Sequence, residues 1–302
     1  MTLLTIGSRE LLKNFSLEMT AKDTESLETA SRSIPAGTAV NLTYLANETT
    51  EMRIEAAQAI VDAGLSAVPH ISARRLTSAD ELRDYLERLS AVGAVERLFL
   101  VGGDPSTPVG PFPDALSVIR SGRLGEFGVR EVGITGYPEG HPDIAEATLW
   151  DALEQKLAAL DRAGIEASVT TQVSFDSTAV AKWIAEVRGW GIEVPIRVGV
   201  PGPAGIKRLL GFARRLGVSA NAALLKKYGA SVTNLLGKST PATFIERAAE
   251  EFARENVGDV RIHFYTFGGL VATAGWTRDY LADSGRRESR SLSQGESDAD
   301  AS

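Results

Sequence analysis

The 302-residue sequence contains no cysteine. This absence excludes disulfide bonds, thiolate nucleophiles and sulfur-ligated metals, and it is consistent with a reducing compartment. The other soft metal ligands are three histidines, His70, His141 and His263. They fall at or near the ends of expected strands, which leaves a metal hydrolase as one alternative. Because they lack the HxH and HExxH spacings of zinc sites, we expect no bound metal.

Basic residues are also fewer than acidic ones, with 32 Lys and Arg against 39 Asp and Glu. The formal net charge is −7 and the pI about 5.2, which argues against a nucleic-acid partner, because phosphate binding needs clustered Lys and Arg. No apolar run approaches the ~20 residues of a membrane span, and Met1–Arg9 lacks the features of a signal peptide. We therefore expect a soluble cytoplasmic protein without a membrane partner. The sequence carries no indication of its oligomeric state.

Glycine-rich nucleotide motifs are absent as well, since neither GxGxxG nor GxxxxGK[ST] follows an apolar run. Instead, short apolar runs alternate with segments of helical periodicity. Strands are expected at Phe15–Met19, Ala39–Tyr44, Ser66–Ile71, Arg97–Val101, Glu131–Thr135, Ala167–Gln172, Ile196–Val200 and Val260–Thr266. Helices are expected at Glu51–Ala63, Ser78–Val92, Asp143–Ala163, Ser177–Trp190 and Thr243–Asn256.

This alternation predicts right-handed βαβ units and a parallel sheet. Eight such strands favour an α/β fold of the (β/α)₈ TIM-barrel type, as one domain over residues 1–281. The longest insertion, Gly217–Thr240, falls between the seventh and eighth strands. Residues 282–302 are rich in Ser and acidic residues and almost free of apolar ones, which predicts a disordered tail.

Active sites of such barrels lie at the carboxyl ends of the strands. In the first strand, Phe15, Leu17 and Met19 share one face, and the residues at 16, 18 and 20 share the other. If the apolar face meets the helices, Glu18 lies inside the mouth. Partial burial favours the protonated form of a carboxyl group, so Glu18 is a candidate general acid. A structural ion pair with a neighbouring Arg or Lys is the alternative.

Several later strands also end in polar or glycine-rich segments. The loop Gly136–Pro142 presents a phenol, a carboxylate and an imidazole, although a rigid turn that caps the next helix is an equal alternative. Gly102 and Gly103 after the fourth strand allow a ligand to approach the backbone beside Asp104, unless they form a simple turn. The sixth and eighth strands each carry one polar face, comprising Ser168, Thr170 and Gln172 in the sixth and Arg261, His263 and Tyr265 in the eighth.

Taken in order, these motifs resemble the methylenetetrahydrofolate reductase family, whose members fold as (β/α)₈ barrels. The most specific match is Tyr137-Pro-Glu-Gly-His-Pro142, which is similar to the family's strand-five loop almost letter for letter. The similarity runs in register from about Phe15 to Thr266. The other matching segments are Leu42–Asn47, Val68–Ile71, Gly103–Pro105, Thr171–Gln172 with Phe175–Asp176, and His263–Thr266.

The resemblance implies reduction of 5,10-methylenetetrahydrofolate to 5-methyltetrahydrofolate by NADH or NADPH. It makes Glu18 the general acid, Asp104 the carboxylate that stabilises the 5-iminium cation, and Gln172 a hydrogen-bonding partner of the pterin. The substrate-binding set expected with Gln172 comprises Thr43, Tyr44, His70, Tyr137, Glu139 and His141. The cofactor contacts expected are Gly102, Gly103, Tyr137 and His141.

The sequence departs from the family where flavin contacts are expected. Gly102 stands where the family has an arginine, and Leu45 stands where it has a glycine. Leu157–Leu160, in the helix expected after the fifth strand, replaces basic residues, and Met19–Lys22 replaces Phe-Phe-Pro-Pro. Loss of phosphate-binding cations weakens dinucleotide binding. We therefore expect no tightly bound FAD and direct hydride transfer to the folate, as in the actinobacterial-type branch that the pattern resembles. A tetrahydrofolate-dependent methyltransferase or demethylase and a catalytically inactive folate-binding protein remain as alternatives.

Overall fold

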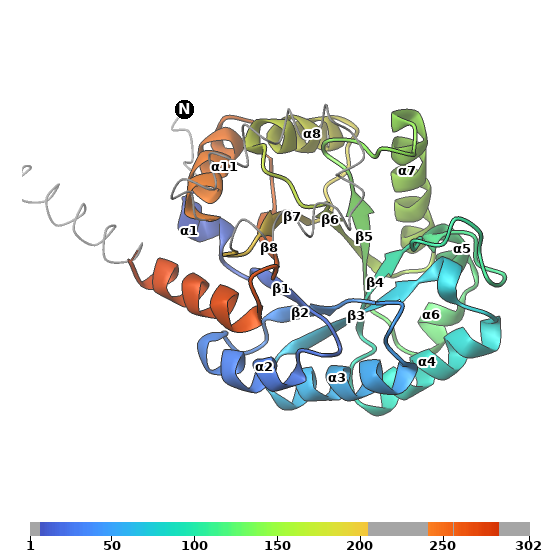
Figure 1. Cartoon of the computed structure of the whole chain (residues 1–302). Coiled ribbons are helices and arrows are strands. Elements are labelled where there is room, and N and C mark those ends of the chain that lie inside the picture. The colour runs from blue at the N-terminus through green and yellow to red at the C-terminus, as the bar shows by residue number, and fades with distance from the viewer. Residues whose placement is uncertain (1–6, 205–240, 256, 284–302) are drawn as a thin grey trace, which may run out of the picture.

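Eight parallel strands close into a barrel in sequential order, β1 to β8 (Figure 1). The computed structural model describes residues 7–204, 241–255 and 257–283, so the expected insertion at Gly217–Thr240 and residues 284–302 of the expected tail lie outside the described residues. Closure pairs β1 with both β2 and β8, with Ser16 opposite Ala39 on one side and His263 on the other. The predicted TIM barrel is confirmed.

The strands lie within two residues of their predicted bounds, because the apolar runs used to predict them are the buried strands of the barrel. They are β1 (Ser16–Met19), β2 (Ala39–Leu42), β3 (Ser66–Ser72), β4 (Arg97–Val101), β5 (Glu131–Gly136), β6 (Glu166–Thr171), β7 (Ile196–Pro201) and β8 (Val260–Tyr265).

The five predicted helices are present and cover the outside of the barrel (Figure 1). They are α3 (Thr50–Asp62), α4 (Ala79–Ala91), α7 (Glu146–Arg162), α8 (Ser177–Gly189) and α11 (Pro241–Glu255). The expected cap of α4 is observed, since the Ser78 hydroxyl accepts the Glu81 amide at 3.1 Å. The Glu81 carboxylate, however, accepts the amide of Thr77, one residue before the cap.

Shorter elements were not predicted, because three to seven residues carry too little periodicity to be recognised. They are α1 (Ser8–Leu11), α2 (Thr24–Ala30), α5 (Ala115–Arg120), α6 (Arg123–Glu126) and the 3₁₀ turns η1 (Ser31–Ser33) and η2 (Ala73–Arg75). Residues 270–283 form a further helix, which includes the first two residues of the expected tail.

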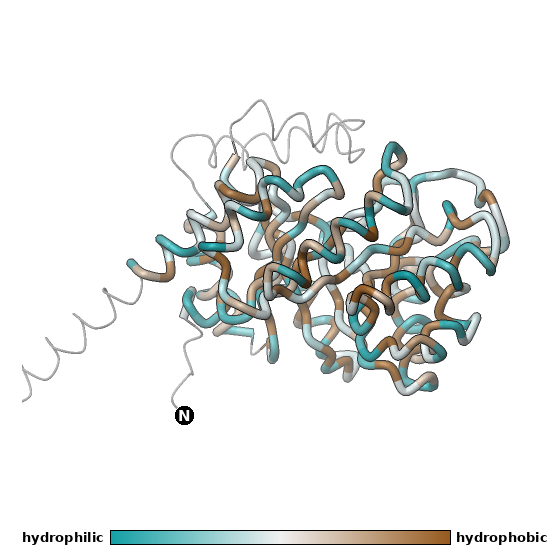
Figure 2. The backbone as a smooth tube through the Cα atoms, turned by 90° about the horizontal axis from the view of Figure 1, so that it is seen from below, coloured by the Kyte–Doolittle hydropathy of each residue, from teal (hydrophilic) through white to brown (hydrophobic). Residues whose placement is uncertain are grey.

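The main core lies between the outer faces of the strands and the helices. Leu17 and Phe264 are fully buried there, and the Phe264 ring meets Phe15 and Trp276 edge to face. Hydrophobic and hydrophilic segments alternate along the helices in Figure 2, as expected of helices that bury one face. Within the described part of the chain, no helix is both long enough and apolar enough to cross a membrane.

The barrel interior is filled by side chains rather than left as a pore. Phe99 of β4 points inward and is buried. A Cβ on Gly133 of neighbouring β5 would lie 2.5 Å from the Phe99 ring, so glycine is required at this position. Above this layer, the inward faces of β1, β6 and β8 become polar, and the candidate site begins.

Candidate active site

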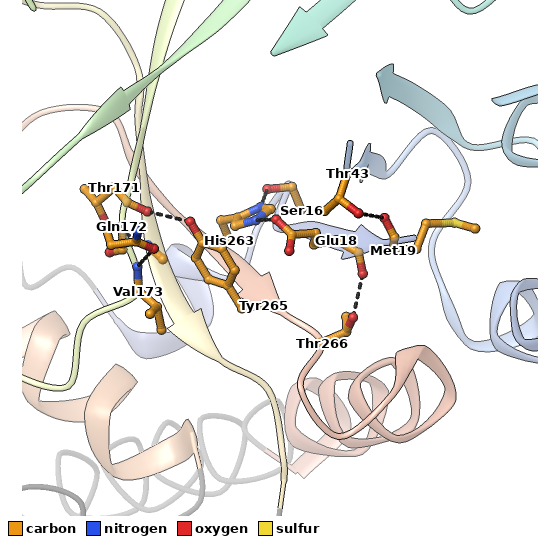
Figure 3. A network of polar contacts seen from close by, with 11 residues as sticks. Ser16, Glu18, Met19, Thr43, Thr171, Gln172, Val173, His263, Tyr265 and Thr266 are labelled. Atoms are coloured by element: carbon orange, nitrogen blue, oxygen red, sulfur yellow. Dashed lines mark hydrogen bonds and ion pairs between the residues drawn. The ribbon is translucent and has the colours of Figure 1, made fainter. Parts of the chain in front are cut away.

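An acid–imidazole pair lies at the mouth of the barrel, where the first and last strands meet (Figure 3). The strand register places Ser16 and Glu18 on the inner face of β1, beside His263 of β8. The Ser16 hydroxyl and His263 Nδ1 are 2.9 Å apart, and His263 Nε2 lies 3.7 Å from a Glu18 carboxylate oxygen. The Glu18 side chain is 20% exposed, whereas His263 is fully buried. The predicted inward orientation of Glu18 is therefore observed, and the basic side chain beside it is a histidine rather than an Arg or Lys.

His70 lies close enough to this pair for both Glu18 and His263 to influence its pKa. It belongs to β3, is buried, and packs its ring against Phe99 at a centroid distance of 4.7 Å. Burial lowers the pKa of His70 to about 4, the negative charge of Glu18 opposes this shift, and His263 adds to it. Nε2 of His70 is buried without a hydrogen-bond partner in the described part of the chain. His70 is consequently a neutral imidazole at physiological pH.

Tyr265, the last residue of β8, lies beside His263 at the same rim. Its hydroxyl donates to the carbonyl of Thr171 at 3.1 Å, and its ring meets His263 edge to face. Burial raises the pKa of Tyr265 well above its ordinary value, and the nearby Glu18 and Tyr137 raise it further. Tyr265 therefore stays protonated and links the acid on β1 to the carboxyl end of β6.

Gln172 lies directly after β6, beside this contact (Figure 3). Its backbone amide donates to the carbonyl of Gly136, and its side-chain carbonyl accepts the amide of Val173 at 3.0 Å. These bonds fix the side chain next to Thr171 and Tyr265. The structure thus brings Gln172 to the same rim as Glu18, as predicted.

Two threonine hydroxyls hold the β1 backbone that carries the acid. Thr266 donates to the carbonyl of Glu18 at 2.6 Å, and Thr43 donates to the carbonyl of Met19 at 3.2 Å (Figure 3). Thr43 was predicted to bind substrate, and its hydroxyl is engaged with the backbone of β1. This bond joins the ends of the first two strands, and substrate binding by Thr43 stays a prediction.

Asp104, the second predicted carboxylate, lies at the same end of the barrel but in a different environment. It forms a two-pronged ion pair with Arg75, with bonds of 2.8 and 2.6 Å. The Asp104 side chain is 74% exposed and that of Arg75 is 23% exposed. The guanidinium lowers the pKa of the Asp104 carboxyl below its usual range. Asp104 is therefore ionised, but a cation already neutralises it.

The glycines before Asp104 differ in their surroundings. A Cβ on Gly103, which has φ 95°, would lie 2.2 Å from the Ser72 hydroxyl, so this turn requires glycine. A Cβ on Gly102 would meet no atom within 4 Å among the described residues, and open space lies beside its backbone. Tyr44, from the end of β2, stacks on the buried Arg53, whose guanidinium lies 3.8 Å from the ring centroid. Tyr44 is thereby fixed at the rim.

The strand-five loop makes mainly local contacts. His141 Nδ1 accepts the amide of Asp143 at 3.1 Å, and its ring meets that of Tyr137 edge to face. Glu139 accepts the Ser174 hydroxyl at 2.7 Å, which ties the loop to the segment after β6. Of these predicted contacts, Tyr137 lies near enough to Tyr265 to influence its pKa.

Four residues of this site were absent from the predicted set of site residues. Ser16, His263 and Tyr265 could have been found, because Ser16 shares the inner face of its strand with Glu18, and His263 and Tyr265 share the inner face of β8. Arg75 carried no usable signal, since it lies in the short turn η2 next to another arginine, Arg74. Arg74 instead binds the backbone carbonyls of Pro105 and Pro113 and shapes the loop after β4.

The buried His70 makes the folded state sensitive to acid. Its folded pKa of about 4 is below the ordinary 6.5, so the unfolded chain binds more protons between these values, and stability falls as pH drops. We expect this residue to account for about 2 kcal/mol of lost unfolding free energy between pH 7 and pH 5. Urea unfolding of wild type and His70→Gln at both pH values measures this. An equal pH dependence in the two proteins would contradict it.

Within the described residues, no group of three or more His, Cys, Asp or Glu side chains is arranged to hold a metal ion. The fold and the rim define a TIM barrel with a carboxyl group beside an imidazole at the carboxyl ends of its strands. A sequence profile described as methylenetetrahydrofolate reductase matches residues 13–273. The chain belongs to the methylenetetrahydrofolate reductase family.

Two curated relatives match parts of the chain. Methylenetetrahydrofolate reductase 2 of Saccharomyces cerevisiae is 29% identical over 161 residues, which is 50% of this chain and 25% of the yeast protein. Methylenetetrahydrofolate reductase (NADH) 1 of Arabidopsis thaliana is 34% identical over 110 residues, which is 34% of this chain and 17% of the plant protein. The matched segments thus span a quarter or less of these relatives.

A solved structure from Clostridium thermocellum has a similar fold, with a TM-score of 0.55 at 14% identity, over 89% of this chain and 94% of that one. It is described as an uncharacterised protein that binds two copies of 5-methyl-5,6,7,8-tetrahydrofolic acid. At this identity the similarity supports the barrel fold alone.

Proposed function

We propose that this protein reduces 5,10-methylenetetrahydrofolate to 5-methyltetrahydrofolate with NADH or NADPH as the hydride donor. The observation that carries the proposal is Glu18 at the barrel mouth, 3.7 Å from His263, in a member of this family. Opening of the imidazolidine ring requires a proton on the departing nitrogen, and a carboxylic acid is suited to supply it. The hydride then adds to the methylene carbon and completes the methyl group.

Each neighbouring group has a distinct task in this proposal. The buried His263 packs beside Glu18, with Nε2 3.7 Å from a carboxylate oxygen and no direct hydrogen bond between them, and Ser16 on its other nitrogen fixes the orientation of the ring. Asp104 faces the positive charge that develops on the folate, and Gln172 binds the pterin edge. Neutral His70 and protonated Tyr265 complete the wall without adding charge.

The chain's residues fit a resident flavin poorly, which favours direct transfer between the two substrates. Gly102 offers no guanidinium, and Leu45 places an exposed branched side chain next to Tyr44. Lys156, the basic residue nearest to the expected position in α7, is buried, and desolvation lowers its pKa to about 8. None of these three residues presents an accessible cation to a dinucleotide phosphate.

The purified protein is therefore expected to be colourless and to oxidise NADH only when methylenetetrahydrofolate is present. Its absorption spectrum, followed by a steady-state assay with each nicotinamide nucleotide, measures both properties. A yellow protein with stoichiometric flavin would disprove direct transfer but not reduction. Methyl transfer to tetrahydrofolate without NADH consumption would instead identify a methyltransferase.

A further inference from the structure

A cavity of about 470 Å³ lies at the amino-terminal end of the barrel, opposite to the rim that carries Glu18. Its wall is built from residues that precede strands or begin them, such as Phe15 before β1, Thr38 before β2 and Arg97 at the start of β4. A volume of this size is within the range of small-molecule sites. The cavity is separate from the proposed reaction site, because inward-facing side chains such as Phe99 fill the barrel between them.

The lining of this cavity has one sign of charge. Among the described residues that form it, four are basic and none is acidic. The basic residues are Arg9, Lys13, Arg97 and Arg197. A concave surface lined by one sign of charge, with low-dielectric walls, concentrates counter-ions of the opposite sign.

The carboxylates around the cavity do not compensate for all of this charge. Glu131 is ion-paired with Arg97 and also accepts the Ser168 hydroxyl, and Asp259 is ion-paired with Arg261 at 2.9 Å. Lys13 is paired with Glu10 at 2.7 Å. Among the described residues, the three arginines at positions 97, 197 and 261 thus outnumber the two carboxylates, Glu131 and Asp259, with which they interact.

Of these three arginines, Arg197 is the one without an ion pair among the described residues. It is partly buried, and its guanidinium donates to the neutral backbone carbonyl of Asn14 at 2.9 Å. Burial lowers the pKa of Arg197, Glu131 and Asp259 attract its charge, and Arg97 and Arg261 repel it. A partly buried cation held mainly by neutral groups is unfavourable, and a bound anion would relieve this cost.

We propose that this cavity binds a small polyvalent oxyanion, with Arg197 as the central ligand and Arg97 and Lys13 at its sides. The expected ligand carries two or more neighbouring anionic groups, either phosphates or carboxylates. Both groups can accept paired hydrogen bonds from the planar guanidinium of arginine. This proposal is independent of the reaction proposed at the other end of the barrel.

Isothermal titration of the full-length protein with inorganic pyrophosphate and, separately, with citrate tests the proposal at fixed ionic strength. We expect saturable binding of one anion per chain by at least one of the two probes, and the preferred probe distinguishes a phosphate from a carboxylate ligand. Arg197→Gln should weaken it about 10- to 100-fold, the value of one charge-assisted hydrogen bond or more. Lys13→Gln, at an exposed position that folding tolerates, should weaken it several-fold.

Arg130→Gln is the matched control, because Arg130 lies at the same end of the barrel but outside the cavity, where it is 78% exposed beside Glu96. It should bind the probe as wild type does. Absence of saturable binding by both probes, or equal affinity in the Arg130→Gln, Lys13→Gln and Arg197→Gln variants, would overturn the proposal. If Arg197→Gln does not fold, the comparison of Lys13→Gln with Arg130→Gln decides the outcome alone.

Discussion

Replacing Glu18 by Gln is expected to lower kcat for NADH-dependent reduction of methylenetetrahydrofolate by ~10²- to 10⁴-fold. The amide has nearly the shape of the carboxyl group, so the contacts of β1 with Thr43 and Thr266, which use backbone carbonyls, remain. What is lost is the proton that opens the imidazolidine ring. Because ring opening precedes hydride transfer, KM for NADH should change little while kcat falls.

Glu96→Gln is a suitable control for this experiment. Glu96 lies before β4 at the opposite end of the barrel, is 63% exposed and pairs with Arg130. Its variant should retain wild-type rates. His263→Gln removes the imidazole 3.7 Å from Glu18 and should shift the pH–rate profile as well as lower the rate. If Glu18→Gln turns over as fast as wild type, Glu18 is not the acid.

Replacing Asp104 by Asn is expected to lower kcat/KM by ~10²-fold, the scale of one preorganised electrostatic contact. The substitution removes the negative charge that would face the iminium cation and leaves the guanidinium of Arg75 in place. An unpaired arginine at this rim repels the developing positive charge, so the loss should exceed that of a simple deletion of the carboxylate.

The pair invites a double-mutant cycle with Arg75→Gln. Arg75→Gln alone should keep or increase the rate, because Asp104 is no longer neutralised. Since Arg75 lowers the pKa of Asp104, its removal should move the acid limb of the pH–rate profile to higher pH. The double variant should recover part of the activity that Asp104→Asn loses. Wild-type rates in Asp104→Asn would contradict a role for this carboxylate.

Strand alternation was enough to predict the orientation of Glu18. The pattern of Phe15, Leu17 and Met19 required one face of β1 to be buried against helices, and Glu18 then had to point into the barrel. The same period of two placed His263 and Tyr265 together on β8. Which side chains of a strand face the barrel interior depends only on neighbouring residues of that strand. The prediction holds in the folded protein because the carboxyl ends of all the strands lie at one rim.

Local pattern was also sufficient to identify loops but not the partners of their side chains. Glu139 and His141 were expected at a ligand, and the structure engages them with Ser174 and the Asp143 amide. Asp104 was expected to face the pterin, and no pattern in the sequence indicated that Arg75 would pair with it. These contacts depend on how adjacent βα loops lie across the rim, and loop conformation is not encoded by periodicity.

The sequence by itself determined the eight-stranded α/β architecture and the inward orientation of Glu18. It also determined the resemblance of the chain to one reductase family. Only the tertiary structure decided which charges meet. Barrel closure brings Ser16 against His263, far apart along the chain, and places Arg197 near two carboxylates, Glu131 and Asp259, and two further arginines, Arg97 and Arg261, at the amino-terminal end of the barrel. The reason is physical: hydrophobic periodicity is a property of each segment, whereas electrostatic pairing depends on distances that exist only after the first and last strands have joined.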